Sequence, residues 1–116
     1  MERVAIAVDF DGTITLNEEN FPKCEYPNSW LIEELIKLQE KGIRLILFTL
    51  REGENLAGAV EFCKRYGLTF DAVNDNLPER IEKWKCNPRK IAADYYVDNR
   101  NLTVNDLFNM IWRGDI

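Results

Sequence analysis

Short runs of apolar residues along the chain predict the strands of a sheet. Residues 4–8 (VAIAV) and 44–48 (RLILF) are short and almost continuously apolar, and each is followed at once by a polar residue. Runs of this length without alternation are typical of strands that are buried on both faces. Residues 70–73 and 95–97 show the same pattern over shorter lengths and predict two further strands.

Between these runs, apolar residues recur at the spacing of a helix. The first predicted helix begins with Ser29 as its N-cap, carries a stripe of leucine and isoleucine, and ends at Gly42. The second covers residues 56–66 and ends at the following glycine. A last helix covers residues 104–111, with Thr103 as its expected cap.

The order of these elements predicts the fold class. Residues 10–27 contain glycine, asparagine and two prolines, so we expect a loop or a small irregular hairpin, and a loop of this length suggests a function. The remaining strands and helices alternate, which predicts a mostly parallel sheet with helices on both faces. The sequence therefore predicts an α/β fold, with residues 1–116 forming a single domain.

The composition narrows the range of functions. A chain that is 46% hydrophobic and 30% charged is an ordinary globular one. No apolar run approaches the roughly 18 residues of a membrane span, and no basic and apolar leader opens the chain, so we expect no membrane partner. The net charge of −5 disfavours general attraction to nucleic acid or anionic lipid.

The cysteines and the missing histidine exclude further classes of site. The three cysteines form no CxxC pair, which indicates reduced thiols and predicts a cytoplasmic location. The chain has no histidine, so a nucleophile that borrows an imidazole base is not expected, and most zinc sites of the Cys/His type are disfavoured.

Polar residues follow three of the four predicted strands at the point where each strand ends. Asp9 and Asp11 come after the first strand, Thr49 after the second and Asp98 after the last. Ligands of open α/β sheets bind beyond the carboxyl ends of the strands. We therefore expect these four side chains to converge on one edge of the sheet.

The most specific of these segments is residues 9–13, which read DFDGT. Two carboxylates two residues apart repel each other if both face one pocket, and a hard cation relieves that repulsion. Carboxylate oxygens together with water and a substrate phosphate are a usual environment for Mg²⁺, for which Asp98 would be a further ligand. The alternative is a plain turn at Asp11 and Gly12, with Asp9 as a solvated strand end. A calcium loop of the EF-hand type does not fit the residues that follow.

Thr49 and Lys90 have both a functional and a structural interpretation. The Thr49 hydroxyl at a strand end suits a phosphoryl oxygen, although such a residue is more often a helix cap. Lys90 lies eight residues before Asp98 and would bring positive charge to a site that binds a phosphate dianion. Taken alone it reads as a solvated surface group, and Lys83 and Lys85 compete for the same role.

In this order, the DFDGT segment, Thr49, Lys90 and Asp98 resemble the motifs of the haloacid dehalogenase-like (HAD) superfamily. The resemblance spans residues 4–101 and implies a three-layer Rossmann-like core and a magnesium-dependent phosphohydrolase, a phosphatase that forms an aspartyl-phosphate. It implies that Asp9 is the nucleophile and Asp11 the general acid and then the general base. Thr49 and Lys90 would hold the phosphoryl group, and Asp9, Asp11 and Asp98 would bind Mg²⁺.

Two features bear on what such a site would accept. Residues 10–27 are too few to build a cap domain, so the resemblance is to small capless members with an open site. Such a site admits a phosphorylated small molecule or an exposed macromolecular phosphate, or it is covered by a second copy in a homo-oligomer. The segment 79–90 carries a local charge of +3, which would steer an anionic substrate or simply form a solvated loop.

Asn99 and Arg51 leave alternatives open. Asn99 stands where relatives often have a second acid, which could weaken metal binding. Arg51 would bind a second anionic group or pair with a surface acid. Asn99 and the absence of a cap make a domain that binds Mg²⁺ or a phosphorylated ligand without turnover the main alternative function, and a phosphoacceptor signalling domain is a third.

Overall fold

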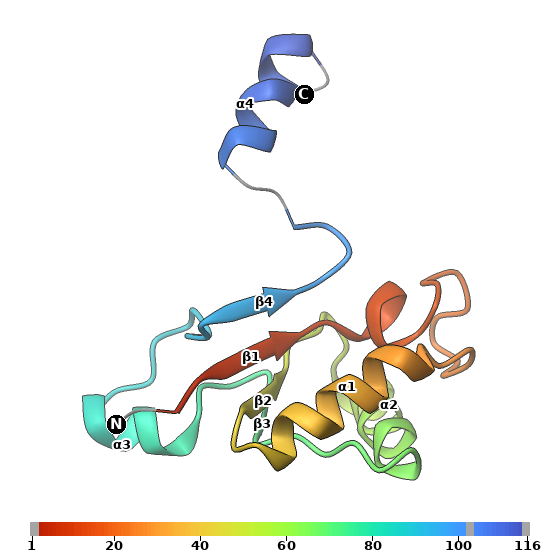
Figure 1. The fold of residues 1–116 in the computed structure, drawn as a ribbon. Coiled ribbons are helices and arrows are strands. Elements are labelled where there is room, and N and C mark those ends of the chain that lie inside the picture. The colour runs from red at the N-terminus through yellow and green to blue at the C-terminus, as the bar shows by residue number, and fades with distance from the viewer. Residues whose placement is uncertain (1–2, 102–103, 115–116) are drawn as a thin grey trace.

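The computed structural model describes residues 3–101 and 104–114, and its centre is a sheet of four parallel strands. These strands are β1 (Ala5–Val8), β2 (Arg44–Leu47), β3 (Ala72–Val73) and β4 (Tyr95–Val97). Their order in the sheet is β3-β2-β1-β4, with every pairing parallel (Figure 1). The predicted α/β fold with a Rossmann-like parallel sheet is confirmed, and β1 is a central strand as its continuous burial requires.

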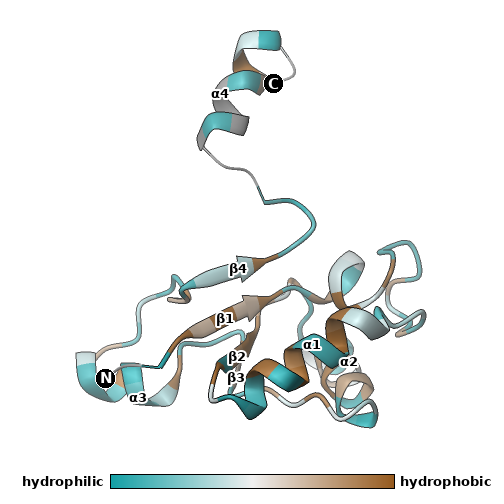
Figure 2. Ribbon diagram, in the orientation of Figure 1, coloured by the Kyte–Doolittle hydropathy of each residue, from teal (hydrophilic) through white to brown (hydrophobic). Residues whose placement is uncertain are grey.

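Two helices cover one face of this sheet. They are α1 (Ser29–Glu40) and α2 (Gly53–Arg65), and they agree with the predicted helices apart from their ends. Val8 and Leu47 of the strands pack with Leu35 of α1 and Phe62 of α2 in one core cluster. Figure 2 shows the hydrophobic residues concentrated along β1, β2 and stripes of the two helices. Burial of this shared core holds the strands whose ends form the candidate site.

The cap of α1 differs from the predicted one. The N-cap is Asn28, whose side-chain oxygen accepts a hydrogen bond from the Leu31 backbone N–H at 3.3 Å. Its amide also donates to the Thr13 carbonyl at 3.2 Å, which ties the start of α1 to the loop after β1. The prediction of Ser29 as the cap is therefore wrong, because asparagine caps at least as well as serine and here makes a second contact.

The other face of the sheet is covered by a segment whose helix the sequence pattern did not predict. Leu77 and Ile91 pack against Ala5, Ala7 and Ile46 in a second cluster. Between them lies α3 (Pro78–Trp84), where a loop was one of the expected alternatives. The helix is short and begins with proline at its first position, so no apolar stripe of several turns marks it.

β3 is shorter than the predicted strand at residues 70–73. The Asp71 side chain accepts a hydrogen bond from the Leu45 backbone N–H at 2.8 Å. The Asp71 backbone N–H donates to the Leu45 carbonyl at 2.8 Å. Because a side chain supplies part of this pairing, only Ala72 and Val73 form regular strand.

The segment after β1 is a closed loop, as expected for residues 10–27. It opens with a short irregular helical turn, η1 (Phe10–Ile14), whose buried Phe10 and Ile14 anchor it to the core. Thr15 and Pro27 form an isolated antiparallel bridge that brings the loop's two ends together. The far end of the loop therefore comes back beside its own beginning, directly before α1 starts.

The last helix, α4 (Val104–Arg113), agrees with the prediction for residues 104–111, while its expected cap Thr103 lies outside the described residues. Figure 1 shows α4 standing away from the sheet. Within the part of the chain that the structure describes, no helix is long and apolar enough to cross a membrane.

Candidate functional site

The register of the sheet brings the ends of three strands to one level. Val8 pairs with Leu47 on one side and with Val97 on the other. The Asp9 backbone N–H then donates to the Val97 carbonyl at 2.9 Å, and the Phe48 N–H donates to the Val8 carbonyl at 2.8 Å. The residues that follow these three strands therefore lie side by side at the carboxyl edge.

A cavity of about 320 Å³ opens at this edge. Four of the five predicted site residues line it: Asp9, Asp11, Thr49 and Asp98. The other lining residues are Glu18, Phe48, Leu50, Asn99 and Arg100. The volume suits a small ligand, and the lining combines several carboxylates with apolar side chains.

Asp9 lies among like charges in this cavity. Partial burial is the largest effect on its carboxyl group and raises its pKa above the ordinary value of 3.8. The negative charges of Asp98, Asp11 and Glu18 raise the pKa further, while a backbone hydrogen bond from Phe10 opposes the rise. A carboxylate held in this way gains free energy when a cation or a hydrogen-bond donor enters the cavity.

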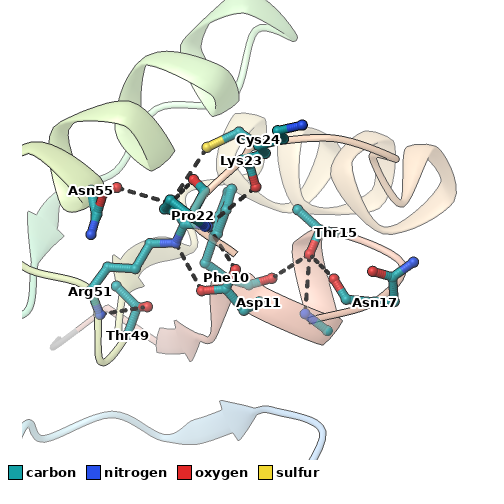
Figure 3. A network of polar contacts seen from close by, with 11 residues as sticks. Phe10, Asp11, Thr15, Asn17, Pro22, Lys23, Cys24, Thr49, Arg51 and Asn55 are labelled. Atoms are coloured by element: carbon teal, nitrogen blue, oxygen red, sulfur yellow. Dashed lines mark hydrogen bonds and ion pairs between the residues drawn. The ribbon is translucent and has the colours of Figure 1, made fainter. Parts of the chain in front are cut away.

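Asp11 is held by Arg51. The guanidinium donates from Nε to Asp11 Oδ2 and from Nη2 to Asp11 Oδ1, each at 2.8 Å (Figure 3). The side chain of Arg51 is 1% exposed, whereas that of Asp11 is 21% exposed and reaches the cavity. Hydrogen bonds to Asp11 raise the pKa of Arg51 above its ordinary value. Of the two alternatives for Arg51, pairing with an acid is observed, and the acid belongs to the candidate site.

Thr49 lies in the turn after β2, which is held by the side chain of Asn74, the residue after β3. Its hydroxyl oxygen accepts a hydrogen bond from the Arg51 backbone N–H at 3.2 Å. The side chain of Asn74 spans the same turn, accepting from the Thr49 N–H at 2.8 Å and donating to the Arg51 carbonyl at 3.2 Å. A hydroxyl that accepts one hydrogen bond still carries its own proton, so Thr49 can donate to a ligand in the cavity.

Lys90 is not among the residues that line the cavity, and it is exposed. Its backbone carbonyl accepts a hydrogen bond from the buried Asn76 side chain at 3.2 Å, and Asn76 also accepts from the Ala92 N–H at 2.7 Å. Asn76 thus fixes the backbone on which Lys90 stands, while the contact of Lys90 with a phosphoryl group stays a prediction.

Arg80, which belongs to the locally basic segment 79–90, has a structural role. It is buried and donates to the Ala92 carbonyl at 2.6 Å, with the Asp94 carboxylate 3.4 Å away. An arginine that is buried against backbone and acid does not steer substrate from outside. Lys85 instead pairs with Glu82 one turn earlier on the surface.

Two charged residues at the cavity were missed by the sequence reasoning. Glu18 and Arg100 form an ion pair of 2.8 Å that joins the loop after β1 to the segment after β4. Their side chains are exposed, and the hydrogen bond to Glu18 raises the pKa of Arg100. The length of the loop at 10–27 and the proximity of Arg100 to Asp98 in sequence were the available signals.

The glycine of the DFDGT segment is required by its surroundings. Gly12 has a φ of +79°, in the left-handed region that other residues rarely adopt. A Cβ atom at this position would lie 2.4 Å from the Asn99 amide nitrogen. Asn99, which stands where relatives often have a second acid, therefore packs directly against Gly12, the residue after Asp11.

The carboxylates can be tested for their fit to a divalent cation. Among residues 3–101 and 104–114, no group of three or more carboxylate, thiol or imidazole side chains is clustered closely enough to hold a metal ion. Asp9 and Asp98 nevertheless line the same cavity, and the charge of Asp98 acts on Asp9. Mg²⁺ usually takes only one or two carboxylates and completes its shell with water and substrate phosphate. Asp9 and Asp98 therefore fit Mg²⁺ that is bound by two carboxylates together with water and phosphate, rather than by protein groups alone.

Comparison with known proteins adds one relative. No protein-family model and no curated protein matches the sequence. A solved structure of a conserved protein from Bacteroides thetaiotaomicron matches with 36% sequence identity over 97% of this chain and 93% of that chain, with a TM-score of 0.73. Identity at this level over nearly the full length of both chains means that the chain belongs to the same family as this Bacteroides thetaiotaomicron protein.

Proposed function

We propose that the protein is a magnesium-dependent phosphomonoesterase of the HAD superfamily. The observation that carries the proposal is that Asp9, Asp11, Thr49 and Asp98, which follow three different strands, line one cavity. A solvated strand end or a plain turn does not require four such side chains in one place. Phosphoryl transfer needs mainly positioning and charge stabilisation, which this set of groups supplies.

The first chemical step uses the carboxylate of Asp9 as nucleophile. One of its oxygens attacks phosphorus, and the bond between phosphorus and the ester oxygen breaks as the aspartyl-phosphate forms. Asp11 gives its proton to the departing oxygen, so the leaving group departs as an alcohol. Proton transfer of this kind typically contributes about 10²- to 10⁴-fold to the rate.

The second step returns the protein to its starting state. A water molecule attacks phosphorus while the Asp11 carboxylate takes one of its protons. The bond between phosphorus and the Asp9 oxygen then breaks, which releases inorganic phosphate and restores the Asp9 carboxylate. Asp11 ends protonated, ready for the next ester.

Charge on the phosphoryl group must be balanced for Asp9 to approach it. Asp9 and Asp98 would hold Mg²⁺, which supplies positive charge at the phosphoryl oxygens, and the participation of Asp11 as a third ligand stays a prediction. The Thr49 hydroxyl would donate to one of these oxygens, and Lys90 would add positive charge.

The substrate class follows from the openness of the site. Among the described residues, the cavity is lined by the segments that follow β1, β2 and β4, including the ion pair of Glu18 and Arg100. We propose a phosphorylated small molecule or an exposed phosphate on a macromolecule as substrate, with a second copy of the chain as a possible cover.

The experiment is hydrolysis of an aryl phosphate with Mg²⁺, with EDTA, and by two variants. Asp9→Asn removes the proposed nucleophile, and Glu33→Gln changes an exposed carboxylate on α1 as a matched control. We expect turnover that needs Mg²⁺, survives Glu33→Gln and disappears in Asp9→Asn. Turnover by Asp9→Asn near the wild-type rate would refute the role of Asp9.

The engagement of Asp11 by Arg51 and the small number of clustered carboxylates favour a second candidate, a domain that binds a phosphorylated ligand or Mg²⁺ without turnover. Calorimetric binding of Mg²⁺ or inorganic phosphate, together with no hydrolysis of any ester tested, would support this candidate. Stable phosphorylation by a small donor would instead support a phosphoacceptor domain.

A further inference from the structure

The side chain of Arg51 is buried and forms all its hydrogen bonds within the protein. Its side chain is 1% exposed, so it cannot reach a substrate in the cavity. Besides the two hydrogen bonds to Asp11, Nη1 donates to the carbonyls of Pro22 at 3.0 Å and Asn55 at 3.1 Å, and Nη2 lies 3.4 Å from the Lys23 carbonyl. All five N–H groups of the guanidinium therefore have acceptors. The alternative of a second anionic substrate group on Arg51 does not fit this burial.

The surroundings of Arg51 fix it in one orientation. Its guanidinium lies over the rings of Phe10 and Phe21, at 4.8 and 5.0 Å from the ring centroids. Its backbone belongs to the turn that Asn74 spans from β3. The arginine thus joins the loop after β1, the turn after β2 and the start of α2, with Asp11 as its one carboxylate partner in the hydrogen bonds described (Figure 3).

The fork of Arg51 leaves part of Asp11 available. Each carboxylate oxygen of Asp11 accepts one hydrogen bond from the guanidinium, and each oxygen has a second lone-pair direction. The part of the side chain that is exposed faces the cavity that Asp9 also lines. A carboxyl group held on one side by a rigid fork cannot rotate freely about its own side-chain bonds.

We propose that Arg51 is a positioning residue that aims the carboxyl group of Asp11 at the oxygen of the leaving group. This inference rests on the proposed function, because it assigns Arg51 a part in the transfer of the proton by Asp11. Its consequence for the first step is selective: losing the fork should slow the release of a leaving group that needs a proton and spare one that departs without it. The second step, in which Asp11 acts as the base, is the same for every ester and should slow equally.

The test compares two substrates, a phenyl-type ester with a strongly acidic phenol and a simple alkyl phosphate, with Mg²⁺ present. Arg51→Lys keeps the charge but loses the fork. We expect the rate of leaving-group release in a single turnover to fall by about 10²-fold on the alkyl ester and by less than about threefold on the aryl ester, with little change in KM. Arg51→Lys combined with Asp11→Asn should be no slower than Asp11→Asn alone.

Two further variants separate positioning from general damage. Phe21→Leu removes one ring from the guanidinium at an exposed position, so the variant should fold, and we expect a loss of about twofold to fivefold on the alkyl ester only. Arg44→Lys alters an arginine that pairs with Asp71 and Glu79 outside the cavity, and it should leave both rates unchanged.

The outcomes distinguish this inference from the proposed function. Equal losses in the rate of leaving-group release on both esters, a loss that appears in KM, or an unchanged release rate on the alkyl ester in both Arg51→Lys and Phe21→Leu would overturn the positioning role while the phosphatase activity stands. Absence of turnover on both esters by the wild-type protein would overturn the proposed function and this inference with it.

Discussion

Replacing Gly12 by alanine adds one methyl group beside the candidate site, directly against the Asn99 side chain. Gly12 has a φ of +79°, and the new Cβ would lie 2.4 Å from the Asn99 amide nitrogen and 3.3 Å from the Asn99 side-chain carbon. Both a backbone strain and a steric contact therefore result. The contact is with the end of a flexible side chain, so we expect the Asn99 amide to move rather than the strands.

The size of the effect follows from these two causes. A residue other than glycine in the left-handed region costs roughly 1 to 2 kcal/mol, and most of the destabilisation of Gly12→Ala should come from this cause. For a domain of this size the melting temperature should fall by about 3 to 12 °C. Displacement of Asn99, next to Asp98, should also lower the rate of turnover, which the stability change alone does not require.

Urea unfolding of four variants separates the two causes: Gly12→Ala, Gly42→Ala, Asn99→Ala and the double variant Gly12→Ala/Asn99→Ala. Gly42 has a φ of +96° with no atom within 4 Å of its added Cβ, so Gly42→Ala reports the backbone strain alone. Gly12→Ala should be destabilised at least as much as Gly42→Ala, and less so when Asn99→Ala removes the amide. A Gly12→Ala protein as stable as wild type would refute the backbone argument. A cost unchanged by Asn99→Ala would refute the steric one.

Three other predictions concern stability and thiol reactivity. The pKa of Asp9 is raised in the folded state, so ionisation of Asp9 removes stability as the pH rises from 3.8 through that raised pKa. Asp9→Asn should therefore be more stable than wild type in urea at neutral pH in EDTA, and the difference between the two should disappear below pH 3.8. Burial raises the pKa of Cys63 to about 12, so a thiol reagent at neutral pH should label the exposed Cys86 and spare Cys63 in mass spectra until urea unfolds the chain. Asn28→Ala should cost about 1 kcal/mol in thermal unfolding and Ser29→Ala clearly less, with the reverse order contradicting the observed cap.

The main elements of the fold were predictable because their burial is recorded in local patterns. Residues 4–8 and 44–48 are apolar on both sides of the strand, as central parallel strands must be. The parallel order then predicts that Asp9, Thr49 and Asp98 meet at one edge, since all carboxyl ends of such strands point the same way. These three residues do line one cavity.

The features that were missed depend on contacts between distant segments. The short α3 carries only one buried residue, Arg80, so no periodic stripe marks it as a helix. The pairing of Asp11 with Arg51 joins residues 40 positions apart, and no local spacing encodes it. Whether the exposed side chain of Lys90 contacts a ligand in the cavity likewise depends on the path of its loop. The Asn76 side chain fixes that path by donating a hydrogen bond to the Lys90 carbonyl.

The most direct test of the central claim is to trap the phosphoryl group on the protein. Asp11→Asn removes the base for hydrolysis, so an aryl phosphate with Mg²⁺ should leave its phosphoryl group on the protein long enough for acid quenching and peptide mapping. The account predicts one phosphoryl group, on the peptide that contains Asp9, and none in Asp9→Asn. Turnover by the wild-type protein with no phosphoryl group on that peptide, or with the group on another residue, would contradict it.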